Sequence, residues 1–231
     1  MTPIIILTGG GLKGAIAAAR YARDHELWLT HLNYGQRGVA SEIEAMRDLA
    51  RSFPAAHVLA LDLGFVTQLL RRESSPKETA TSSTEQESAA IIVARRGLPL
   101  TLLSVGVHVA ARMGASSVVT GFSRRCNQTH VGVPASEVQP DFVRELVHAM
   151  NIVGDVMDYG RGPTRIEAPL MDLTYTEVVK LAHRFEIPFE RTWTCDAQPK
   201  HPCGNCDRCR ERDRAFSDAR LTDTLLRAVT R

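Results

Sequence analysis

The stretch that decides the fold is residues 4–14, Ile-Ile-Ile-Leu-Thr-Gly-Gly-Gly-Leu-Lys-Gly, where an apolar run passes through a glycine turn into an alanine-rich segment. The run from Ile4 to Leu7 is typical of a short, fully buried strand, and Ala15 to Tyr21 is typical of the start of a helix. A buried strand that turns directly into a helix is the opening of an α/β fold.

Strand-like and helix-like patterns alternate along the rest of the chain. Further strands are expected at 27–32, 57–63 and 117–121, and further helices at 41–51, 99–113, 141–153 and 174–185. Thr174 and Glu177 form the pattern of a capping box at the start of the last of these. The alternation predicts a doubly wound, mainly parallel, Rossmann-like sheet with helices on both faces. Ligands of such sheets bind beyond the carboxyl ends of the strands, where the strand order reverses.

Length and composition restrict the class of protein. The chain has 231 residues, 44% hydrophobic and 23% charged, which is ordinary for a globular domain. A net charge of +2 gives no drive toward nucleic acid or a membrane surface. No apolar run reaches the roughly 20 residues of a membrane span. The N-terminal residues lack the basic region of a signal peptide, so we expect a cytoplasmic protein.

Four of the five cysteines, Cys195, Cys203, Cys206 and Cys209, cluster near the C-terminus. In a cytosolic chain such a cluster indicates a metal, and four thiolates suit tetrahedral Zn²⁺ with no open position. We therefore expect a structural zinc site, with an iron–sulfur cluster as the alternative. We expect residues 1–190 to form a nucleotide-binding domain and residues 191–231 a zinc-binding segment of the same globule. Residues 210–231 read as a surface helix.

The glycine turn, Thr8-Gly9-Gly10-Gly11-Leu12-Lys13-Gly14, suits a phosphate group, because backbone N–H groups and a helix N-terminus converge there. It fits the dinucleotide pattern at Gly9, Gly11 and Gly14, but the second strand ends in Asn33-Tyr34 rather than in an acid. It does not fit the Walker pattern. It also resembles the pyrophosphatase loop (PP-loop) of ATP-dependent adenylating enzymes, Ser-Gly-Gly-x-Asp-Ser. The remaining interpretation is that these glycines form a tight turn that binds no ligand.

Several segments, in their order along the chain, resemble the 7-cyano-7-deazaguanine synthase family. They are Tyr34-Gly35-Gln36-Arg37, Ser41-Glu42-Ile43, Gly114-Ala115 with Val118 to Gly121, Ala168 to Thr174, Ile187-Pro188, Thr192 to Cys195, and Pro202 to Cys209. The resemblance implies a nucleotide α-hydrolase fold with a zinc knuckle, and a homodimer. It also implies a ligase that uses ATP and Mg²⁺ to convert 7-carboxy-7-deazaguanine and ammonia into a nitrile, in the queuosine pathway.

By this resemblance the nucleotide and the substrate are expected to bind residues of the glycine turn and of later strand ends. They are Thr8, Gly9, Gly10, Gly11, Leu12, Lys13, Gly14, Tyr34, Gln36, Arg37, Arg96 and Gly121. The resemblance identifies no catalytic residue in this chain.

Residues 71–88 are expected to form a solvated polar loop or a lid that closes over the ligand.

The chain departs from the family where phosphate and base are recognised. Aligned on the glycines, the loop has lost both serines, and Lys13 replaces the acid. A lysine is a point cation for phosphate but does not coordinate a metal. The segment before the long helix keeps Arg96 without the asparagine that follows in the family. Arg124 and Arg125 stand where the family has carboxylates.

Two other functions remain open from the sequence alone. One is a non-catalytic relative that binds a ligand or a partner protein on the same scaffold, as the lost serines and acid would allow. The other is an NAD(P)-binding protein built on the glycine turn, with Arg37 near a 2′-phosphate. The cysteine cluster does not belong to the second class.

Overall fold

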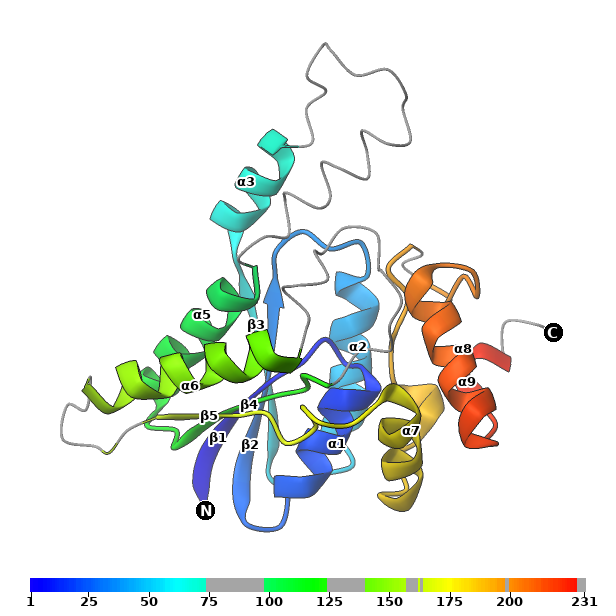
Figure 1. Ribbon diagram of the computed structural model, residues 1–231, viewed down its shortest axis with the longest axis horizontal. Helices are drawn as coiled ribbons and strands as arrows, with labels where there is room; N and C mark the ends of the chain where they lie inside the picture. The colour runs from blue at the N-terminus through cyan, green and yellow to red at the C-terminus, as the bar shows by residue number, and fades with distance from the viewer. Residues whose placement is uncertain (74–97, 124–139, 157–161, 163, 198–199, 228–231) are drawn as a thin grey trace.

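The computed structural model describes residues 1–73, 98–123, 140–156, 162, 164–197 and 200–227. A five-stranded sheet lies at its centre, in the order β3-β2-β1-β4-β5 (Figure 1). The strands are β1 Thr2–Leu7, β2 His25–Asn33, β3 Ala56–Asp62, β4 Ser117–Thr120 and β5 Arg165–Glu167. Every pairing between neighbours is parallel. The predicted doubly wound α/β fold is confirmed.

Helices connect the strands and follow the sheet. They are α1 Leu12–Tyr21, α2 Val39–Ala50, α3 Gly64–Glu73, α5 Leu98–Met113, α6 Pro140–Val156, α7 Tyr175–Arg184, the 3-10 turn η2 Phe189–Arg191, α8 Asp207–Ala219 and α9 Thr224–Arg227. The capping box at α7 is confirmed, because Thr174 accepts from the backbone of Glu177 and Glu177 accepts in return. The sequence did not predict α3 or β5.

The sheet separates two hydrophobic layers. Ile4 and Ile6 of β1 face α1, α2 and α7, and Ile5 between them faces α5 and α6. All three side chains are fully buried. Burial on both faces explains why this strand is a continuous apolar run rather than an alternating one.

The strand order reverses at β1. The chain moves from β1 to β2 and β3 on one side, then crosses to β4 and β5 on the other. The carboxyl ends of β1 and β4 therefore lie side by side with connections leaving in opposite directions, which opens a crevice between them. The glycine turn follows β1 directly, so the fold places it in this crevice.

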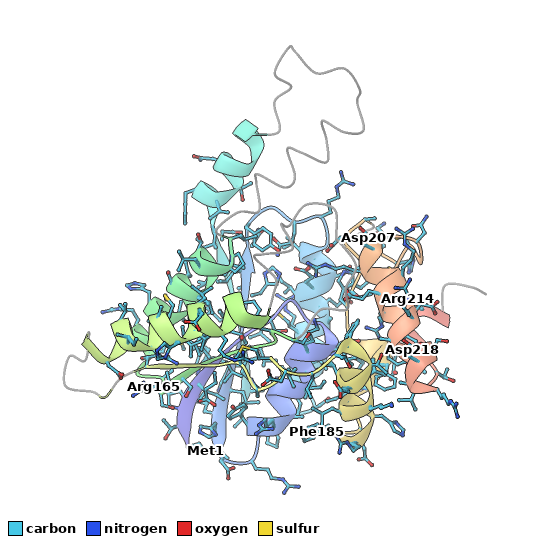
Figure 2. The ribbon with its side chains drawn as sticks, viewed as in Figure 1. Met1, Arg165, Phe185, Asp207, Arg214 and Asp218 are labelled. Carbon is cyan, nitrogen blue, oxygen red and sulfur yellow. The ribbon has the colours of Figure 1, made fainter. Side chains whose placement is uncertain are left out.

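The tail differs from the single surface helix predicted for residues 210–231. Helix α8 ends at Ala219, Arg220 has a left-handed backbone (φ 58°), and α9 follows separately. Arg214 and Asp218 lie on the outer side of α8 (Figure 2). Arg212, however, is fully buried. The prediction was wrong because periodicity does not show that a charged side chain has a buried partner.

Two sequence expectations lie mainly outside the described residues. Of the predicted loop or lid at 71–88, residues 71–73 belong to the end of α3 and the others are not described. Arg96, Arg124 and Arg125 are also outside the described residues. Within the part of the chain that is described, no helix combines the length and apolar character needed to cross a membrane.

Candidate functional site

A cleft of about 610 Å³ lies at the carboxyl ends of β1, β2 and β4, where the strand order reverses. The glycine turn and the C-terminal segment both contribute to its lining. Residues from several separate parts of the chain line it: Thr8, Gly9, Gly11 to Gly14, His31, Tyr34, Gln36, Glu42, Leu102, Leu103, Gly121, Phe122, Tyr175, Trp193, Thr194, Asp196 and Cys206 to Arg208, among others. This is where the fold predicts a ligand to bind.

The glycine turn is held in shape by two hydrogen bonds. Thr8 Oγ1 accepts from the backbone nitrogen of Gly10 at 3.1 Å. The backbone nitrogen of Trp193 donates to the Gly10 carbonyl at 2.9 Å, which ties the C-terminal segment to the turn. Gly10 has φ 68°, and a Cβ there would lie 2.5 Å from the Glu42 carbonyl oxygen. Only glycine meets both conditions without displacing α2.

Helix α1 begins in the cleft without a side-chain cap. Its N-cap is Gly11, and no acidic residue occupies its first turn. The first N–H groups of a helix have no partner within the helix, and they carry the positive end of the helix dipole. Together with the glycine turn they form a site suited to a phosphate group.

Lys13 adds a cation at the same place. It lies in the first turn of α1, and its Nζ sits 5.0 Å from the centre of the Tyr175 ring. Burial raises the pKa of Tyr175, so the phenol stays neutral. On the other side, a Cβ on Gly121 would lie only 2.8 Å from the Lys13 Cβ. The end of β4 therefore approaches the lysine stem closely.

A braced carboxylate, which sequence reasoning did not identify as part of the site, lies beside the turn. Oε2 of Glu42 on α2 is 2.7 Å from Nε2 of His31 on β2 and 3.0 Å from Nε2 of Gln36. His31 is 1% exposed and the Glu42 side chain 12%. The three residues are near one another in the sequence but lie in a strand, in the loop after it and in the next helix. Nothing in the sequence around His31 indicated that their side chains meet.

The structure brings most of the predicted nucleotide residues to this one cleft. Tyr34, Gln36 and Gly121 line it together with the turn. Gln36 is also fully engaged by the protein, since it accepts from the Tyr34 nitrogen and donates to the Leu32 carbonyl and to Glu42. Gly10 and Arg37 are not among the lining residues, and Arg37 is exposed.

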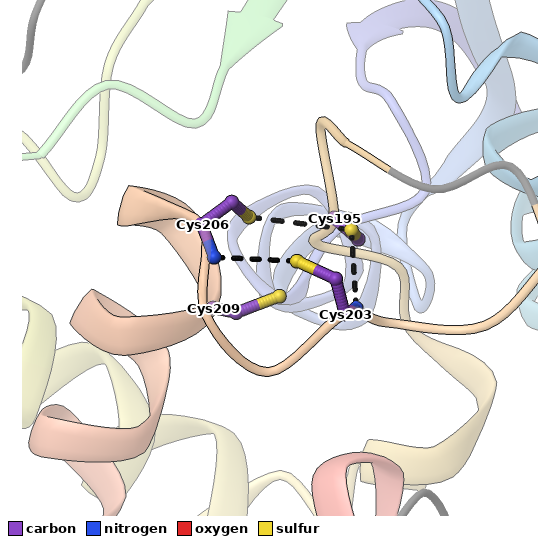
Figure 3. A group of neighbouring side chains, drawn as sticks. All are labelled: Cys195, Cys203, Cys206 and Cys209. Atoms are coloured by element: carbon purple, nitrogen blue, oxygen red, sulfur yellow. Dashed lines mark hydrogen bonds between the residues drawn. The ribbon is translucent and has the colours of Figure 1, made fainter.

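The four cysteines of the C-terminal segment come together, as predicted. Their sulfur atoms all lie within 4.8 Å of one another, and Cys195 Sγ is 4.0 Å from Cys206 Sγ (Figure 3). A single zinc ion with Zn–S bonds of about 2.3 Å places its four sulfurs roughly 3.8 Å apart. The donor set and its spacing therefore fit a metal site.

Backbone N–H groups donate hydrogen bonds to two of the sulfur atoms, and such bonds favour the thiolate form that binds a cation. The Cys206 nitrogen donates to Cys203 Sγ at 3.2 Å, and the Cys203 nitrogen donates to Cys195 Sγ at 3.4 Å. Burial opposes ionisation of Cys203, but hydrogen bonds from the backbone of Asn205 and Cys206 lower its pKa to about 7. Burial raises the pKa of Cys209. A buried thiol of this kind becomes a thiolate when a metal replaces its proton.

Comparison with known proteins agrees with this architecture. 7-Cyano-7-deazaguanine synthase of Acidobacterium capsulatum is 29% identical over 241 aligned residues, covering 97% of this chain and 98% of that protein. The synthase of Methanothermobacter thermautotrophicus is 29% identical and covers 95% and 96%. Residues 3–220 match the family described as queuosine biosynthesis protein QueC. The chain therefore belongs to the QueC family.

Proposed function

We propose that this protein is a 7-cyano-7-deazaguanine synthase, an ATP-dependent carbon–nitrogen ligase that converts 7-carboxy-7-deazaguanine and ammonia into the nitrile. The observation that carries the proposal is the position of the glycine turn. It sits at the reversal of strand order, in a cleft large enough for a nucleotide and a bicyclic base. Full-length similarity to curated synthases supports the same activity.

The chemistry requires two activations by ATP. In the first, the substrate carboxylate attacks the α-phosphorus of ATP, pyrophosphate leaves, and an acyl adenylate forms. Ammonia then displaces AMP to give an amide. The amide oxygen then attacks the α-phosphorus of a second ATP and pyrophosphate leaves. Departure of AMP, which carries away the amide oxygen, and of two protons from the nitrogen gives the nitrile. Magnesium, where bound, would neutralise phosphate charge during these steps.

The residues of the cleft supply binding and orientation. The turn and the N-terminus of α1 hold phosphate oxygens, and Lys13 contributes a positive charge. Holding the carboxylate and the α-phosphorus in line removes the entropic cost of bringing them together. Leu102 and Phe122, which are partly exposed and line the cleft, offer apolar surface for a ring.

The metal site is proposed to hold structural zinc. Four protein thiolates leave no coordination position for a substrate. A four-iron cluster would hold each thiolate on a different iron and so hold them farther apart than one ion does. The proposal also includes a homodimer in the cytoplasm, on the resemblance stated above.

We predict that Lys13→Met weakens ATP binding. It removes a charged contact worth about 1.5–3 kcal/mol, or roughly 10–150-fold in the dissociation constant. Isothermal titration with ATP measures the change. Lys180→Met is the matched control, because Lys180 lies on the exposed face of α7 outside the cleft. An unchanged affinity in Lys13→Met would remove the lysine from the phosphate site.

We also predict that Gly14→Ala abolishes ATP binding. A Cβ at residue 14 would lie 1.9 Å from Thr8 Oγ1, so Thr8 would have to move and release Gly10. The same titration measures the loss. Gly64→Ala is the control, since nothing lies within 4 Å of a Cβ there. Full affinity in Gly14→Ala would show that the turn does not hold the nucleotide.

One incubation tests the proposed function as a whole. The protein is mixed with ATP, Mg²⁺, 7-carboxy-7-deazaguanine and ammonia, and the products are analysed by mass spectrometry. We expect AMP and 7-cyano-7-deazaguanine. Neither product, from protein that retains its metal and its fold, would contradict the proposal and favour a non-catalytic binding protein.

A further inference from the structure

A carboxylate beside a phosphate-binding turn needs an explanation. A Cβ on Gly9 would lie 3.3 Å from Cδ of Glu42 and 3.5 Å from each of its oxygens, so the carboxyl group lies against the turn. Both residues line the cleft. Two negative groups at this distance repel each other, and low dielectric increases the repulsion. Positive charge must offset this repulsion when a phosphate binds, and Arg208, which also lines the cleft, interacts electrostatically with Glu42 without being able to coordinate a metal.

The two oxygens of Glu42 have different surroundings. Oε2 receives the bonds from His31 and Gln36. A carboxylate only accepts, so the His31 Nε2 donates, and both hydrogens of the Gln36 amide are used, on Oε2 and on the Leu32 carbonyl. Oε1 accepts no hydrogen bond from any residue that the structure describes, and it lies as close to the turn as Oε2 does, 3.5 Å from the position of a Cβ on Gly9. One oxygen fixes the group and the other is left for a ligand.

We propose that Glu42 Oε1 binds the magnesium ion that accompanies ATP, in place of the acid that the glycine turn lacks. The inference rests on the proposed function, because the other ligands of the ion are phosphate oxygens and water. Mg²⁺ is commonly held by one or two carboxylates together with substrate phosphates. Ligating carboxylates are in turn fixed by outer hydrogen bonds, which is the role of His31 and Gln36.

Lys13 and Glu42 have different roles because residue 13 is a lysine where the family has an acid. Lys13 cannot coordinate a metal, but it can pair with a phosphate oxygen directly. Glu42 approaches from α2, on the other side of the turn, and supplies the oxygen ligand. The cation and the metal-binding carboxylate thus act on different parts of the triphosphate.

The experiment compares ATP affinity with Mg²⁺ and with a chelator, by isothermal titration, in the wild type and in Glu42→Gln. The wild type is expected to bind ATP more tightly when Mg²⁺ is present. In Glu42→Gln this enhancement is lost, and binding in chelator is tighter than in the wild type, because a negative charge beside the phosphates is gone. A purely structural role for Glu42 would not produce the second change.

A direct metal readout accompanies the titration. Electron paramagnetic resonance of Mn²⁺ follows the ion itself, and the ATP-bound wild type should immobilise Mn²⁺. Glu42→Gln should not, and His31→Gln should reduce Mn²⁺ affinity by about 10–100-fold. Glu44→Gln is the matched control on the same helix, since Glu44 is exposed and outside the cleft. Thermal unfolding shows that the variants are folded.

Three results overturn the proposal. If Glu42→Gln keeps the Mg²⁺ enhancement, the ion is held elsewhere. If it weakens ATP binding equally with Mg²⁺ and with chelator, Glu42 only supports the turn. If the wild type binds no ATP under either condition, the proposed function fails, and the inference fails with it.

Discussion

Cys209→Ser is expected to release the metal and to unfold the C-terminal segment. Cys209 is fully buried and packs with Trp193 and Cys195 in a small cluster. Binding of structural zinc contributes about 10–16 kcal/mol in isolated zinc-finger peptides, and this is free energy of folding. Because the sheet has a hydrophobic core of its own, loss of this free energy should unfold residues 191–227 before the rest of the protein.

The effect should reach the nucleotide cleft. Trp193 donates to the Gly10 carbonyl, and its indole donates to the Cys195 carbonyl at 2.9 Å. Loss of the metal therefore loosens a support of the glycine turn. Metal content by mass spectrometry should fall from about one ion per chain to none, and ATP affinity should fall with it. Cys126→Ser, at the cysteine outside the cluster, is the control. A fully metallated Cys209→Ser protein would refute the ligand assignment.

Arg212→Ala should be the most destabilising substitution outside the metal site. The Arg212 guanidinium makes two hydrogen bonds to Asp223, at 2.6 and 2.9 Å, and further bonds to Thr192 Oγ1 and the Phe189 carbonyl. Arg212 is fully buried and the Asp223 side chain is 5% exposed. Removing the arginine leaves a buried carboxylate without its partner, which costs about 3–5 kcal/mol.

Equilibrium unfolding in urea measures this loss. Arg214→Ala is the matched control, because Arg214 is an arginine on the same helix but is exposed. It should change the free energy of unfolding by less than about 0.5 kcal/mol. A loss below about 1 kcal/mol in Arg212→Ala would mean that the pair is reached by water in solution. The pair joins α8 to the segment before α9, so it fixes the tail against η2.

The sequence predicted the features that depend on local pattern. The buried run at β1, the glycine turn and the capping box at Thr174 each rest on residues that are neighbours in the chain. The cysteine cluster could be predicted because its ligand spacing is short and its chemistry is specific.

The features that depend on distant partners could not be predicted. β5 is only three residues long, too short to show a period. The sequence around Arg212 is that of a polar helix and does not show that Arg212 is buried against Asp223. Glu42 belongs to an amphipathic helix, and its position against Gly9 follows from packing of α2 on the turn. Strand order, which places the cleft, is likewise a property of the whole sheet.

Adenylation of the substrate carboxylate is the step that the proposed function assigns to this cleft. Exchange of labelled pyrophosphate into ATP measures that step directly, without ammonia and before any nitrile forms. We expect exchange in the wild type that depends on added 7-carboxy-7-deazaguanine, and no exchange in Gly14→Ala. Folded, metal-containing wild-type protein that binds ATP and the carboxylate but exchanges no label would contradict it.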